Sequence, residues 1–107
     1  MAMLEPPYEI LDLADGESAE FRILRYQRGE VTIQTRLEPQ GKTVPVIRVW
    51  VPPEDKPLGA PYWDITSRTL QARLEPVLDM LVVRRQRIRI TKHGVAPTAR
   101  HSVEFLS

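Results

Sequence analysis

The sequence predicts a mainly β (α+β) domain in which five strands form a small barrel, with one helix between the third and fourth strands. Segments that alternate apolar and polar residues, the pattern of half-buried strands, occur on both sides of the middle of the chain. Apolar residues at helical spacing occur over 70–81. The 107 residues, 42% of them apolar, suffice for one hydrophobic core and are too few for two. We therefore expect a single domain, 1–107.

The first half of the chain supplies three predicted strands. Apolar side chains on both faces predict a first strand over 21–28, and a short connection at 28–30 joins it to the second strand as a hairpin. The second strand covers 31–37, where Val31, Ile33, Thr35 and Leu37 share one face. After a turn, the β-rich run 44–51 predicts the third strand.

A proline-rich loop and one helix follow. Four of the ten prolines fall within 52–61, which predicts a loop. Asp64 or Thr66 can cap a helix that begins near Ser67. Pro76 lies inside the helical pattern and removes a backbone hydrogen bond, so we expect a kink there.

The last part of the chain predicts a second hairpin. Residues 86–92 alternate strictly, with Ile88 and Ile90 inward and arginines outward, and 102–106 form the returning strand. The resulting order, three strands, a helix and two strands, is that of an OB-fold, a partly open barrel that commonly binds oligonucleotides. We therefore expect an OB-like domain.

Charge is segregated along the chain. Residues 1–20 contain six acidic residues and no basic one, so 1–14 read as an acidic N-terminal arm, whereas 84–101 contain six basic residues and no acidic one. Arginine outnumbers lysine 12 to 3, and a guanidinium can bind phosphate bidentately or stack on a base. Because no acid interleaves these bases, the second hairpin is predicted to bind an anionic partner in a salt-sensitive way.

The predicted nucleic-acid contacts combine cations with aromatic side chains on which bases stack. They are Arg22, Arg36, Arg48, Trp50, Tyr62, Trp63, Arg87, Arg89, Lys92 and Arg100. The alternative for Trp50 is a place in the core, and Tyr62 and Trp63, beside the proline-rich loop, fit either exposure or packing.

Other functional classes find little support. With no cysteine, the chain has no disulfide, no thiolate zinc site and no thiol nucleophile. His93 and His101 have no evident third ligand, and no phosphate-binding glycine loop or nucleophile motif occurs. We therefore expect a protein that is not an enzyme and has no metal or cofactor. No apolar run spans a membrane and no secretory signal opens the chain, which predicts a cytoplasmic protein.

Three segments resemble the small single-stranded DNA-binding proteins of phages and their relatives. They are Asp15-Gly16-Glu17-Ser18 leading into Phe21-Arg22-Ile23-Leu24, Tyr62-Trp63-Asp64-Ile65-Thr66-Ser67 with Leu70, and Arg89-Ile90-Thr91-Lys92-His93-Gly94 followed by Thr98, Arg100 and Ser102-Val103. The resemblance implies an OB-fold core that coats DNA during replication or recombination, and it adds a viral origin as an alternative. His101 departs from the aromatic residue expected after Arg100, and no acidic tail follows Phe105.

The sequence therefore predicts a non-enzymatic protein that binds single-stranded nucleic acid, with DNA favoured over RNA. The alternative is a protein-interaction or assembly subunit, a homo-oligomer in which the acidic end of one copy meets the basic end of another. In a third arrangement, the acidic arm folds back on the basic hairpin of its own chain and competes with nucleic acid.

Overall fold

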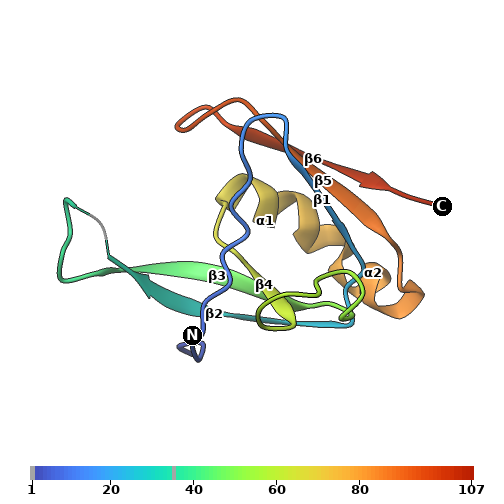
Figure 1. The fold of residues 1–107 in the computed structure, drawn as a ribbon, viewed down its shortest axis with the longest axis horizontal. Helices are drawn as coiled ribbons and strands as arrows, with labels where there is room; N and C mark the ends of the chain where they lie inside the picture. Colours follow the sequence, from blue (N-terminus) through green and yellow to red (C-terminus); the bar gives the residue numbers. More distant parts are fainter. Residues whose placement is uncertain (1, 35) are drawn as a thin grey trace.

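The structure, a computed structural model, describes residues 2–34 and 36–107; Met1 of the predicted arm and Thr35 of the predicted second strand lie outside them. Two antiparallel three-stranded sheets, ordered β1-β5-β6 and β2-β3-β4, enclose a helical segment (Figure 1). In chain order the elements are β1 (Ser18–Phe21), β2 (Arg25–Ile33), β3 (Lys42–Trp50), β4 (Tyr62–Ile65), α1 (Arg68–Leu74), a 3₁₀ turn (Glu75–Val77), α2 (Leu78–Arg84), β5 (Ile88–His93) and β6 (Arg100–Phe105).

The prediction of a five-stranded barrel is wrong. The first predicted strand is divided at 22–24, where the chain passes from one sheet to the other, so that β1 and β2 belong to different sheets. The hairpin expected at 28–30 does not form, because β2 continues through Gly29 and pairs with β3 along its whole length. The edge of β4 is occupied by the N-terminal residues: the Asp64 N–H donates to Glu9 O and the Leu11 N–H to Asp64 O. β6 therefore does not pair with β4.

The third strand and the last hairpin were predicted correctly. β3 covers most of the expected run, and β5 pairs with β6 in an antiparallel register that places Ile90 opposite Val103. Ile88 and Ile90 are fully buried, as their alternation predicts.

The helical segment follows the sequence prediction in its kink and departs from it in its cap. A 3₁₀ turn containing Pro76 interrupts it, as the missing backbone donor requires. The capping residue is Ser67, whose Oγ accepts from the Leu70 N–H at 3.3 Å. Neither Asp64 nor Thr66 caps the helix, since Asp64 lies in β4 and binds Arg48.

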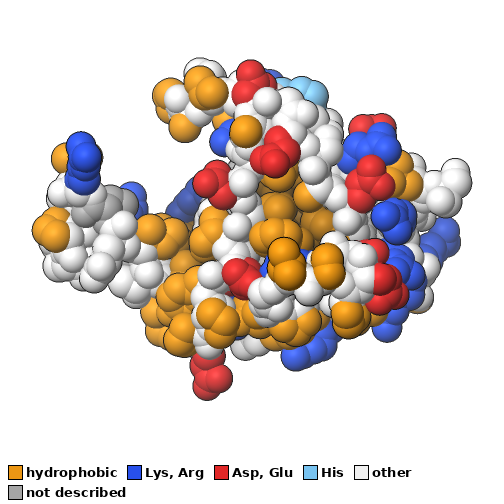
Figure 2. Space-filling view, viewed as in Figure 1, with side chains coloured by type: hydrophobic (Ala, Val, Ile, Leu, Met, Phe, Trp, Pro, Cys, Tyr) orange, Lys and Arg blue, Asp and Glu red, His pale blue; other side chains and the backbone are white. Residues whose placement is uncertain are grey.

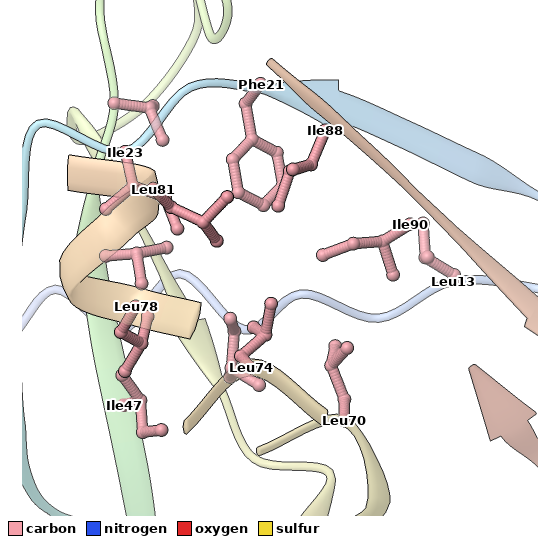
Figure 3. Packing of buried hydrophobic residues seen from close by; sticks show 13 residues of the cluster. Leu13, Phe21, Ile23, Ile47, Leu70, Leu74, Leu78, Leu81, Ile88 and Ile90 are labelled. Carbon is pink, nitrogen blue, oxygen red and sulfur yellow. The ribbon is translucent and has the colours of Figure 1, made fainter. Parts of the chain in front are cut away.

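One hydrophobic core joins the helical segment to both sheets. Leu70, Leu74, Leu78 and Leu81 point into it, and Figure 3 shows them among side chains of both sheets. The spacing of these leucines places them on one side of the helical segment. The opposite side therefore faces outward, and its polar residues are available to form a surface.

The N-terminal arm is ordered by contacts with the second sheet. It crosses from β2, where the Leu4 N–H donates to Glu30 O at 2.9 Å, to the edge of β4. Gly29 permits this close approach, since a Cβ there would lie 2.6 Å from the Leu4 Cγ. Leu4 packs with Val31 and Val46 in a second small cluster. The arm is thus part of the fold and lies against the sheet β2-β3-β4.

Candidate nucleic-acid interface

Arg48, one of the predicted contacts, is held in an ion pair inside the protein. Its Nε donates to Asp64 Oδ1 at 2.7 Å and its Nη2 to Asp64 Oδ2 at 3.1 Å. Both side chains are almost fully buried, at 5% and 0% exposed. Although burial opposes its charge, hydrogen bonding to Asp64 raises the pKa of Arg48. Arg48 thus holds β3 and β4 together and does not lie on an open phosphate track.

Arg89 of β5 and Arg87, just before the strand, are neutralised, contrary to the sequence prediction. The register of β1 with β5 places Glu20 opposite Arg89, and the Arg89 Nε donates to Glu20 Oε2 at 2.9 Å. This hydrogen bond lowers the pKa of Glu20. Arg87 lies 3.5 Å from Glu20 and 3.7 Å from Asp55, while Arg22 binds Asp55 at 3.1 Å. The prediction failed because these acids are distant in sequence and become neighbours only in the fold.

The predicted aromatic residues do not join the basic hairpin. Tyr62 is buried and its hydroxyl donates to Pro7 O at 2.6 Å. Trp63 packs against the core, with the Lys56 Nζ 4.6 Å from the centre of its ring. Trp50 is half-buried beside Arg25. Because Trp50 pairs with Tyr62 at the end of β4 farther from α1, no stacking platform continues the hairpin.

Lys92 and Arg100, in contrast, lie in a groove with two further cations. One hollow is lined by Arg73 and Arg100 and an adjoining hollow by Arg68 and Lys92, and both include Thr69, Pro97, Ala99 and His101. We call this continuous surface between α1 and the β5–β6 hairpin the basic groove, and Arg68, Arg73, Lys92 and Arg100 its four cations. Within the described part of the chain, none of the four forms an ion pair, and no acidic residue lines either hollow.

His101 belongs to the same groove and lines both hollows. It is 8% exposed, and its Nδ1 lies 3.5 Å from the Ser67 Oγ. Burial lowers the pKa of His101 below its usual range, and the nearby charges of Lys92 and His93 lower it further. An anion beside His101 would act in the opposite direction and favour the protonated ring.

Arg36 extends the cationic surface onto a projecting hairpin. The tip of β2–β3 stands out from the body on the side where the turn between β5 and β6 also lies (Figure 1). Figure 2 shows Lys and Arg side chains around the hollow between this tip and the body. Arg36 and Lys42 are exposed, and no described residue forms an ion pair with either.

Sequence reasoning missed Arg68 and Arg73, which lie on α1. A signal was present: no acidic residue occurs over 65–74, so this part of the helical pattern is basic on its polar side. The sequence does not reveal that α1 packs beside β6. This packing brings the two arginines close to Lys92 and Arg100.

The chain matches no protein-family model, no curated protein and no solved structure. Across residues 2–34 and 36–107, no three His, Asp or Glu side chains form a group that could hold a metal ion. None of the helices described is long and apolar enough to cross a bilayer.

Proposed function

We propose that this protein binds single-stranded DNA in its basic groove, as a non-enzymatic, cytoplasmic protein. The observation that carries the proposal is the set of four cations that share one groove without any ion-pair partner among the described residues. Six other cations of the described chain form ion pairs. Three of the four groove cations are arginines, which suit phosphate oxygens because they donate bidentately.

The shape of the groove favours a single strand over a duplex. It is a recess bounded by α1 on one side and the β5–β6 hairpin on the other. A flexible single strand can follow such a recess with its phosphates toward the cations. A duplex is a stiff rod and would touch only the rim. Arg36 and Lys42, on the projecting hairpin, would lengthen the path of the strand.

The assembly alternative has less support, because acidic residues of the N-terminal end find their counter-charges within the same chain. Glu9 binds Lys56 at 2.9 Å, and Glu20 binds Arg89. The competing arrangement also has less support, since the arm lies along β2 and β4, although Asp15 and Glu20, which follow it, contact the basic hairpin. The groove is therefore open to a partner from outside.

A titration of the whole protein with fluorescent oligonucleotides tests the proposal. At low salt, anisotropy should rise with single-stranded DNA, and an unlabelled single strand should compete better than the corresponding duplex or RNA. Arg100→Gln should weaken binding. Arg84→Gln is the matched control, because Arg84 is exposed and without an ion pair at the far end of the helical segment, roughly 25 Å away. Absence of binding at low salt, or equal losses in both variants, would overturn the proposal.

A further inference from the structure

A second hollow lies on the other sheet, between the N-terminal arm and β3. It is lined by Met3, Leu4, Glu5, Gln27, Arg48 and Trp50, and its volume is about 250 Å³. This is smaller than the roughly 300–1,000 Å³ of pockets that hold drug-sized ligands, so it suits a ligand the size of one base. None of the four groove cations lines it.

Arg48 presents an unused donor to this hollow. Its Nε and Nη2 bind Asp64, and Nη2 also lies 3.5 Å from Pro7 O, whereas its Nη1 has no hydrogen-bond partner among the described residues. Among these described residues, every fully buried side-chain nitrogen or oxygen has a hydrogen-bond partner. The Nη1 is therefore not fully buried, and Arg48 lines the hollow. A fixed, charged donor in a small recess is suited to an acceptor oxygen or nitrogen.

Trp50 gives the hollow an aromatic wall whose position is fixed. The guanidinium carbon of Arg25 lies 3.6 Å from the centre of the Trp50 ring, and the Tyr62 ring is 5.6 Å away at a tilt of 60°. Arg25 is exposed and has no acidic partner among the described residues. Its guanidinium can therefore stay over the Trp50 ring and still donate hydrogen bonds to a phosphate of the ligand.

We infer that this hollow binds a guanine base, either of a free nucleotide or of a nucleic-acid strand. Arg48 Nη1 and the Gln27 amide would donate to O6 and N7 of the base, and the Glu5 carboxylate would accept from its amino group. Guanine presents both acceptors to an arginine, whereas adenine replaces the oxygen by an amino donor that meets the guanidinium unfavourably. The base would lie against the part of Trp50 that lines the hollow, while Arg25 covers a face of the ring.

Trp50 fluorescence can test this inference directly. The chain has two tryptophans, so in Trp63→Phe the emission comes from Trp50 alone. Guanosine monophosphate should quench it saturably, and adenosine monophosphate should bind at least about fivefold more weakly. Since Trp63 packs against the core, calorimetric titration of the wild-type protein with the same two nucleotides repeats the test without that substitution.

Three comparisons separate this site from the basic groove and identify its ligand. Gln27→Leu should weaken guanosine monophosphate binding, while Arg100→Gln should leave it unchanged. If the natural ligand is a strand, an oligonucleotide containing dG quenches Trp50 at lower concentration than the mononucleotide; if it is free nucleotide, the mononucleotide alone quenches. No saturable binding of either ligand, equal affinity for the two mononucleotides, or loss in Arg100→Gln would overturn the inference. Oligonucleotide binding with unchanged Trp50 emission would overturn it too, while leaving the groove proposal intact.

Discussion

Replacing Lys92 and Arg100 together by glutamine should halve the salt dependence with which the protein binds a single strand. These are two of the four unpaired cations that line the basic groove. For an oligonucleotide short enough to cover the groove without reaching Arg36 and Lys42, one phosphate contact for each groove cation gives a slope of log affinity against log salt of about −2.8 in the wild type and about −1.4 in the variant. A tenfold rise in salt would then weaken binding about 600-fold and about 25-fold, respectively.

The assay is anisotropy of a labelled oligonucleotide at several salt concentrations, at constant pH. Arg89→Gln is the internal comparison, because Arg89 is already paired with Glu20 and should change the slope little. Arg84→Gln controls for the loss of one positive charge elsewhere on the surface. The reasoning would be refuted if the double variant kept the wild-type slope, or if Arg89→Gln lowered it as much as the loss of a groove cation.

Three further predictions concern the arm, the buried ion pair and pH. Gly29→Ala should lower the free energy of unfolding by about 1–3 kcal/mol in urea denaturation, since its Cβ would lie 2.6 Å from the Leu4 Cγ and 2.8 Å from Ala2 O. Leu4 is itself buried, so Leu4→Ala should also destabilise, but the loss in the double variant should be smaller than the sum of the two single losses. Arg48→Met should cost about 3–5 kcal/mol by leaving Asp64 buried and unpaired, and full stability in the same assay would contradict this. Because the pKa of His101 is lowered in the folded protein, the unfolded chain binds the proton more readily. The contribution of neutral His101 to stability is therefore present above about pH 6.5 and lost as pH falls through the folded pKa. Oligonucleotide affinity should instead rise as pH falls toward the lowered pKa of His101, and His101→Gln should flatten that rise.

The features that the sequence predicted correctly depend on neighbouring residues. Alternation over 86–92 placed Ile88 and Ile90 in the core because side chains of a strand point to alternate faces. Pro76 interrupted the helical segment because its ring removes a backbone donor wherever it stands in a helix. Lys92 and Arg100 both line the basic groove, and their role as nucleic-acid contacts stays a prediction.

The features that it missed depend on which strands and helices become neighbours. Glu20 and Arg89 are 69 residues apart and meet through the register of β1 with β5. The barrel was expected from the order of three strands, a helix and two strands. In the fold an additional strand, β4, pairs with β3, and backbone groups of Glu9 and Leu11 occupy its other edge. No local pattern in either segment reveals these pairings.

The folded structure changes the meaning of the charge segregation. Part of the contrast between the acidic beginning and the basic end is resolved by the ion pairs of Glu20 with Arg87 and Arg89, which are partly exposed and contribute little to stability. The groove is different, because it brings four positive charges to one surface with no acid lining it. Their mutual repulsion opposes folding, and nothing described in the fold offsets it. Departures of this kind from locally favourable chemistry are expected at functional sites, where a partner supplies the missing charge. The charges left unpaired after folding, rather than all the charges of the sequence, are therefore the ones that indicate where an anionic ligand binds.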